Sequence, residues 1–155
     1  MLLSEKDRDY LTEKIAAQGY TPIIYHDEAL GVTAVTTVGL THRGWPELMV
    51  NSAVINVDGL LKVIAYVLEF WEECGHATEG FMPPILYNGH EVVYDIALMS
   101  TEHEEWGTLL YDYYTADGFC PLVAQIIYPD NEGNHPGDED YQNYLGQITF
   151  TKRVH

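Results

Sequence analysis

A polar turn between two apolar runs gathers four side chains that could bind or transform a ligand: His42, Arg43, Trp45 and Glu47. The planar fork of an arginine bonds a phosphate or a carboxylate through two parallel hydrogen bonds. An indole offers a stacking face, and a His near a Glu could form an acid–base pair. In the structural alternative, Trp45 packs on a neighbouring helix and Glu47 bonds N–H groups of the loop. Both interpretations stay open.

A later loop holds a second group of such side chains: Tyr128, Asp130, His135 and Asp138. In the functional interpretation they form a wall of the same pocket, where His135 or Asp130 bonds the ligand. In the alternative, the loop needs them for its turns, because an Asp side chain accepts hydrogen bonds from its own backbone. We favour the alternative for Asp130. A loop of this length in a compact domain is nevertheless more often functional than filler.

Tyrosines are abundant, with 12 in the chain. Tyr111 and Tyr114 are i, i+3 neighbours on a predicted helix, whereas Tyr113 fits the apolar stripe of that helix. Tyr114 could therefore face a cleft or a partner, since tyrosines are enriched at binding surfaces. The three groups predict a ligand-binding set without a catalytic residue: His42, Arg43, Trp45, Glu47, Tyr114, Tyr128, Asp130, His135 and Asp138.

The sequence lacks the motifs of several catalytic classes. It contains no G-x-S-x-G, no P-loop and no G-x-G-x-x-G. Cys74 with His76, or His103 with Glu104, gives no closed set of zinc ligands. We therefore predict neither a metal nor a cofactor, and whether any reaction is catalysed stays open.

The charge balance is unusual: seven Lys and Arg against 24 Asp and Glu give a formal net charge of −17. Such a field repels nucleic acid and anionic membranes, and binding to a phosphate backbone needs clustered Lys and Arg. We expect no direct binding to nucleic acid. The acidity serves solubility in one interpretation, and mimicry of DNA or docking to a basic protein in another.

The sequence shows no sign of a targeting segment. Charges at residues 5–9 interrupt any apolar core of a signal peptide, and no apolar run approaches the roughly 20 residues that span a bilayer. The two cysteines, Cys74 and Cys120, lie far apart, which fits free thiols in a reducing compartment. We expect a cytoplasmic protein that does not bind membranes.

Helix signals occur at three places. Ser4 caps a helix that ends at Gly19. Asp58 caps an amphipathic helix that ends at Gly75. A capping box at residues 101–104 begins a third helix.

Strand signals fill the stretches between the helices. Pro22 indicates an edge strand, because proline cannot donate to a central ladder, and Asn88-Gly89 favours a hairpin turn. The predicted strands are residues 20–26, 32–40, 47–54, 85–87, 91–99, 120–128 and 148–151. The pattern predicts an α+β fold in one domain, 1–155, with an N-terminal helix in 1–19 and a core in 20–151. We expect a mainly antiparallel sheet of about six strands packed by two or three helices.

Two blocks carry a resemblance to a known family. Residues 36–48 read T-x-V-G-L-T-x-x-G-x-P-E-L, and residues 125–136 read Q-I-I-Y-P-D-x-x-G-x-x-P. These blocks resemble the signature of an uncharacterised bacterial and phage family of small domains. The chain departs from that pattern at Gly137, where the family has an aromatic residue. The resemblance implies a shared fold and a shared edge but no established activity, and a phage-encoded protein would act in the cytoplasm of its bacterial host.

Three functions follow, in order of preference. The first is a protein that sequesters a nucleotide-derived small molecule without catalysis, in the manner of a phage anti-defence sponge. The ligand would lie between turn and loop, stacked on Trp45 or Tyr128 and held by Arg43, in a pocket that a homodimer or larger homo-oligomer could complete. The second is an enzyme acting on such a ligand, with His42 or His135 as its acid–base residue. The third is an acidic inhibitor module that binds a protein.

Overall fold

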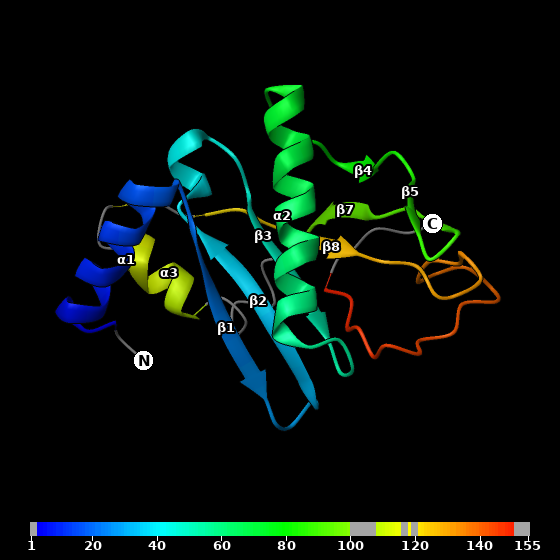
Figure 1. Ribbon diagram of the computed structural model, residues 1–155. Helices are drawn as coiled ribbons and strands as arrows, with labels where there is room; N and C mark the ends of the chain where they lie inside the picture. Colours follow the sequence, from blue (N-terminus) through cyan, green and yellow to red (C-terminus); the bar gives the residue numbers. More distant parts are fainter. Residues whose placement is uncertain (1–2, 100–107, 116–117, 119–120, 151–155) are drawn as a thin grey trace.

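The fold is built around a six-stranded sheet (Figure 1). The computed structural model describes residues 3–99, 108–115, 118 and 121–150. The strand order across the sheet is β1 (Thr21–Asp27), β2 (Val32–Val38), β3 (Glu47–Ser52), β8 (Val123–Ile127), β7 (Asp95–Leu98) and β4 (Gly80–Phe81). Neighbouring strands are antiparallel except β3 and β8. The predicted α+β fold with a mainly antiparallel sheet is confirmed.

Helix α2 (Val57–Cys74) covers one face of the sheet, as its apolar stripe predicts. Its buried side chains pack against β2, β3 and β8 in the largest apolar cluster: Leu60, Ile64, Val67, Leu68 and Trp71. The predicted cap at Asp58 is wrong. Asn56 caps the helix, because its Oδ1 accepts from the Gly59 N–H at 2.8 Å and leaves Asp58 in the first turn.

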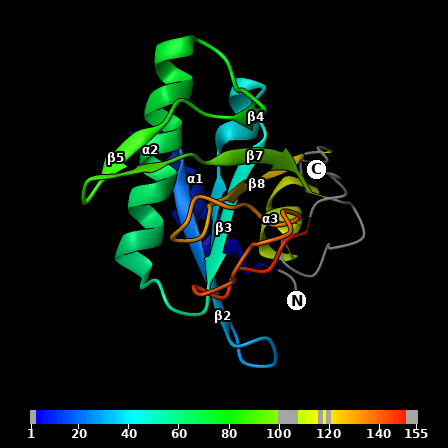
Figure 2. The same ribbon diagram turned by 90° about the vertical axis from the view of Figure 1, so that its right-hand side faces the viewer.

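Helices α1 (Glu5–Gln18) and α3 (Thr108–Thr115) pack together on the face of the sheet opposite α2. Figure 2 shows α2 and α3 on opposite sides of the sheet. The Ser4 cap and the end of α1 at Gly19 are confirmed. The Arg8 guanidinium ties the two helices together by donating to the Tyr113 and Asp112 carbonyls at 2.6 and 2.7 Å. The predicted capping box at residues 101–104 lies outside the described residues, as does Cys120. No helix in the described ranges is long and apolar enough to cross a membrane.

A two-stranded hairpin stands apart from the sheet. It consists of β5 (Ile85–Tyr87) and β6 (His90–Val92), joined by Asn88 and Gly89 at φ 51° and 80°. The predicted hairpin turn is confirmed, because both central residues have the positive φ that a two-residue turn of this kind needs. The predicted strand 91–99 is wrong in one respect: it breaks at residues 93–94, so β6 belongs to the hairpin and β7 to the sheet.

Boundaries of other strands also differ from the prediction. The strands predicted at 32–40 and 47–54 end at Val38 and Ser52, and a short 3-10 helix, η1 (Leu40–Arg43), fills part of the connection. Strand β1 lies at the edge of the sheet, as Pro22 indicates. Strand β4 lies outside the strands that the sequence predicts.

The predicted last strand is wrong for residues 148–150, which cross the sheet without pairing as a strand. Side-chain amides bind this segment instead. The Asn51 amide donates to the Ile148 carbonyl at 2.9 Å and accepts from the Ile148 N–H at 2.7 Å. Gln125 donates to the Ile148 carbonyl at 2.7 Å and accepts from the Phe150 N–H at 2.8 Å. These amides take the place of a neighbouring strand's backbone, so the segment needs no ladder.

Candidate functional site

The two predicted clusters lie at opposite ends of the parallel β3–β8 pair. The turn at residues 41–46 leads into β3 at Glu47, whereas the loop from Tyr128 follows the end of β8. Glu47 pairs with Val123 in parallel register, so the loop begins five residues further along the strands, or about 17 Å at the usual rise per residue. The described residues therefore place the turn and the loop at opposite ends of the strand pair rather than side by side. We call the group at residues 41–47 the turn end, and the group at residues 128–138 the hairpin end.

The turn end is built around the buried carboxylate of Glu47, which has no exposed surface. Its Oε1 accepts from Thr37 Oγ1 at 2.9 Å and from the Leu40 N–H at 3.2 Å. Its Oε2 accepts from the Thr41 N–H at 2.8 Å, the Thr41 hydroxyl and the Tyr114 hydroxyl at 2.6 Å. The carboxylate thus fixes the start of η1, and its hydrogen-bonding capacity is used within the fold. This arrangement matches the structural alternative for Glu47.

Tyr114 is fully buried and joins the same network. Its hydroxyl accepts from the Gly39 N–H at 2.6 Å while it donates to Glu47. Burial, followed by the charge of Glu47, raises the pKa of Tyr114 well above its usual value, so the phenol stays neutral. Gly39 has φ 118°, and a Cβ there would lie 2.9 Å from the Gly19 carbonyl oxygen, which accounts for a glycine at this position.

Three predicted side chains reach the surface of the turn end. The Arg43 guanidinium carbon lies 5.1 Å above the Trp45 ring, and Nη1 pairs with Glu72 Oε1 at 3.2 Å. Trp45 is half-buried and meets Trp71 of α2 edge-on at 5.8 Å, as the structural alternative expects. The exposed His42 contacts Tyr114 edge-on at 5.5 Å. Because the charge of Arg43 is already paired, an anion binding here would compete with Glu72.

At the hairpin end, Asp130 organises the loop through its own backbone. Oδ1 accepts from the Glu132 and Asn134 N–H groups at 2.9 Å each, and Oδ2 accepts from the Gln142 N–H at 2.8 Å. Desolvation raises the pKa of Asp130, but the bonds from Gln142, Asn134 and Glu132 outweigh it and leave the pKa below its usual value. The structure shows the turn chemistry that the sequence favours for Asp130.

Tyr128 is buried, and its polar atoms have partners inside the fold. The Gln147 amide donates to the Tyr128 carbonyl at 2.6 Å and to the Tyr141 hydroxyl at 2.8 Å. The Tyr128 hydroxyl donates to the Asn51 carbonyl at 2.8 Å. The ring therefore packs in the core rather than offering a stacking face. Sequence reasoning did not predict the role of Gln147, because an isolated glutamine gives no signal that it will be buried.

His135 and Asp138 attach the loop to its neighbours. His135 Nε2 donates to the Val93 carbonyl at 2.6 Å, and its ring meets Phe81 edge-on at 5.1 Å. Asp138 Oδ2 accepts from the His135 N–H at 2.8 Å. These contacts tie the loop to β4 and to the break between β6 and β7. Ligand binding by any of these side chains stays a prediction.

The hairpin end also exposes apolar side chains that the sequence does not single out. Phe81, Leu86 and Tyr87 are 58%, 77% and 67% exposed. Strand alternation predicts that one face of a hairpin is buried, but β5 and β6 have only partial cover. Large apolar groups that are exposed are enriched at interaction sites.

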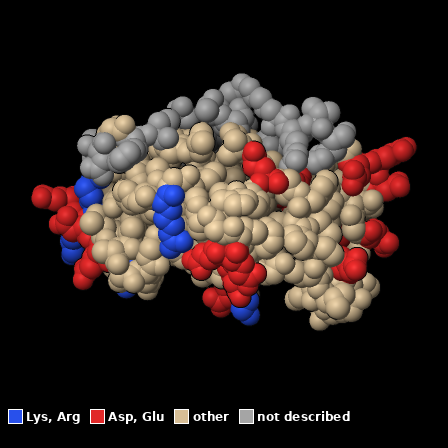
Figure 3. Space-filling view, turned by 90° about the horizontal axis from the view of Figure 1, so that it is seen from above, with Lys and Arg blue, Asp and Glu red and all other residues tan. Residues whose placement is uncertain are grey.

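The two ends also differ in charge. No Lys or Arg occurs between Val63 and Thr151, a range that includes the hairpin and the whole loop. Glu91 on β6 and Glu132, Glu139 and Asp140 in the loop are exposed. In Figure 3 acidic side chains project from the right-hand end of the molecule, where no Lys or Arg is visible. The exposed apolar hairpin therefore lies in a strongly negative field.

Comparison of the chain with protein-family models, curated proteins and solved structures gives no match.

Proposed function

We propose that the protein is an acidic binding module that docks a basic polypeptide on its hairpin end. The observation that carries the proposal is the hairpin itself, which exposes Leu86 and Tyr87 within a stretch of sequence, residues 63–151, that contains no Lys or Arg. Acidic groups would steer a basic partner and speed its encounter, and the apolar groups would supply contact area. Tyrosine is among the side chains that dominate binding energy at interfaces.

The interior of the hairpin end supports this function by holding the surface in place. Asp130 fixes the loop, and the bond from His135 to Val93 joins the loop to the segment between β6 and β7. A surface that is ordered before binding loses less conformational entropy when a partner docks.

Fluorescence anisotropy with a labelled peptide of alternating lysine and leucine tests the proposal. We expect Leu86→Ser to weaken binding about fivefold, as for loss of one apolar anchor. Leu30→Ser is the matched control, because Leu30 is also exposed but lies in the β1–β2 turn. Affinity should fall with added salt for both proteins. Equal affinities of the two variants would show that the peptide is attracted by net charge alone and would overturn the proposal.

A second candidate is the binding of a small anionic, nucleotide-derived molecule at the turn end. The observation that favours it is the exposed Arg43 stacked on Trp45 beside His42. A thermal-shift screen with nucleotides, cyclic nucleotides, ADP-ribose derivatives and flavins tests it. Binding should disappear in Arg43→Ala and increase in Glu72→Gln, which frees the guanidinium. A ligand recovered with altered mass would indicate an enzyme, and His42→Ala should then abolish turnover.

A further inference from the structure

Three tyrosines come from α2, from β5 and from the segment after β6, and two of them are in contact. Tyr66 on α2 and Tyr94, which follows β6, meet edge-on with ring centroids 5.8 Å apart. Both side chains are half-buried. Burial is the main cause that raises the pKa of Tyr94, and the nearby hydroxyls of Tyr66 and Tyr87 raise it further. The Tyr94 phenol therefore remains neutral.

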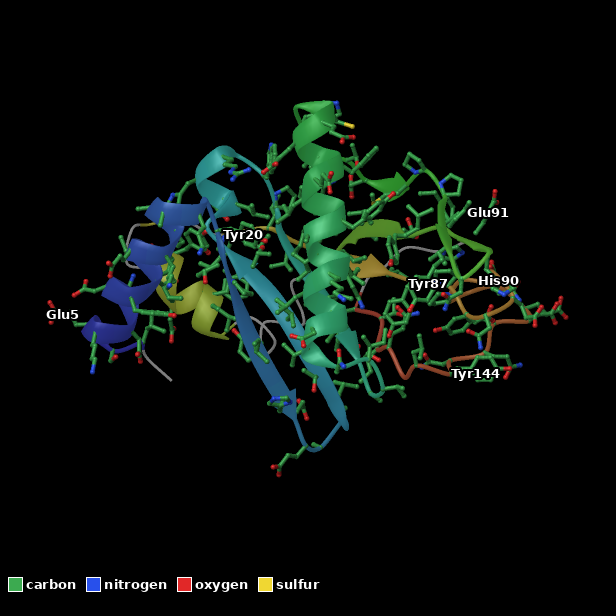
Figure 4. The ribbon with its side chains drawn as sticks, in the orientation of Figure 1. Glu5, Tyr20, Tyr87, His90, Glu91 and Tyr144 are labelled. Carbon is green, nitrogen blue, oxygen red and sulfur yellow. The ribbon has the colours of Figure 1, made fainter. Side chains whose placement is uncertain are left out.

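The hairpin register directs Tyr87 toward this group. Tyr87 pairs with His90 and Ile85 pairs with Val92, so these four side chains share one face, whereas Leu86 and Glu91 share the other. Ile85 and Val92 are half-buried, which marks their face as the inner one. In Figure 4 Tyr87 lies on the side of the hairpin that faces α2, and Glu91 lies away from it. Tyr87 nevertheless keeps 67% of its surface exposed and remains accessible to a partner.

Two carboxylates lie on the same side of α2 as Tyr66. Glu69 and Glu73 follow Tyr66 on α2 at positions i+3 and i+7, which lie on the same side of a helix. Their charges raise the pKa of Tyr66, although burial is the larger cause. Lys62 precedes Tyr66 by one turn, but among the described residues no ion pair or cation–π contact joins it to these tyrosines. In the described part of the chain, the rings and carboxylates therefore make no ion pair or cation–π contact, although Lys62 lies one turn away.

We propose that Tyr66, Tyr87 and Tyr94 form a recess that receives the cationic end of a lysine or arginine side chain from the basic polypeptide. Neutral aromatic faces attract a cation through their quadrupole, most strongly where several rings surround it. Glu69 and Glu73 add charge at the rim. The partner class rests on the proposed function, whereas the recess itself is tested separately. In the alternative, the three rings only pack the hairpin against α2.

The experiment has two arms. In the first, the aromatic ring signals of the labelled protein are followed by NMR while tetramethylammonium chloride is added, with sodium chloride as the control for salt. We expect saturable shifts for Tyr66, Tyr87 and Tyr94, and none for Tyr144, which is exposed on another segment. Saturable shifts would be absent if the rings only packed the hairpin.

In the second arm, the lysine–leucine peptide is compared with the same peptide acetylated at its lysines, which removes the charge and keeps most of the stem. Tyr87→Leu retains apolar area, and the exposure of Tyr87 makes a folding defect unexpected. We expect this variant to bind the charged peptide about three- to tenfold more weakly and the acetylated peptide as the native protein does. Equal affinity of native and variant protein for the charged peptide would overturn the recess but leave the proposed function standing. Ring shifts with tetramethylammonium but no peptide binding would overturn the proposed function and leave the recess.

Discussion

At the turn end polar side chains face inward, and at the hairpin end apolar side chains face outward. Glu47 and Tyr114 have no exposed surface and bond to each other and to the turn. Leu86 and Tyr87 are exposed by more than half, on a hairpin with only partial cover. Glu47 and Tyr114, which the sequence predicts as ligand-binding residues, therefore hold the fold together, and ordinary apolar residues form the surface on which a partner could dock.

The largest difference between the two ends is expected in how a substitution at the turn end changes the free energy of unfolding. Glu47→Gln should lower the free energy of unfolding by about 3 kcal/mol. All partners of the carboxylate are hydrogen-bond donors, so the NH₂ group of a glutamine would face other donors in a buried site. Glu72 is exposed, so Glu72→Gln should lower the free energy of unfolding by less than about 1 kcal/mol. Urea unfolding of both variants measures the difference. Similar losses for the two would show that Glu47 does not have the structural role assigned to it.

A smaller loss is expected from the amide that anchors Tyr128. Gln147→Ala should lower the free energy of unfolding by about 2 kcal/mol, because the Tyr128 backbone and the Tyr141 hydroxyl lose a buried partner. Gln142→Ala is the control, since Gln142 is exposed and its bond to Asp130 uses the backbone N–H. An equal cost for the two, measured by urea unfolding, would mean that Gln147 contributes no more than a surface residue.

Acid should loosen the hairpin end through Asp130. Because the pKa of Asp130 is lower in the folded chain than in the unfolded chain, its ionised form stabilises the fold above the unfolded pKa. That contribution is lost as the pH falls through the folded pKa, below about pH 4. Asp130→Asn should therefore melt below the native protein at neutral pH and approach it in acid. A gap in melting temperature that stays constant between neutral pH and pH of about 3 would contradict this role.

The smallest effects are expected from substitutions of exposed lysines. Lys62→Ala should leave stability within about 0.5 kcal/mol of the native value, yet tighten binding of the lysine–leucine peptide about twofold by removing a like charge near the recess. Lys14→Ala on α1 is the control for the change in net charge. If the two variants bind the peptide with equal affinity, the position of Lys62 beside Tyr66 has no influence on peptide binding.

Local signals in the sequence predict local structure well. The Ser4 cap with Gly19, the edge strand with Pro22 and the Asn88-Gly89 turn each depend on a few adjacent residues, and the structure confirms all three. The start of α2 shows the limit, because Asn56 and Asp58 are both good caps and only the path of the chain selects between them.

Features that depend on distant contacts could not be predicted in this way. The parallel pairing of β3 with β8 joins segments far apart in the sequence, and it is this pairing that separates the two predicted clusters. Burial of Glu47 depends on Tyr114, 67 residues later. Exposure of the hairpin depends on which side chains the sheet leaves uncovered, which strand alternation does not specify.

The parallel pairing also has a consequence for the order of synthesis. Strands β1, β2 and β3 follow one another as an antiparallel meander, but β3 gains its second neighbour only when residues 123–127 have been made. Until then an apolar strand keeps an open edge, and such an edge recruits other chains. Nascent chains truncated between β3 and β8 should therefore aggregate, and the late arrival of β8 makes this closure a slow, long-range step in folding.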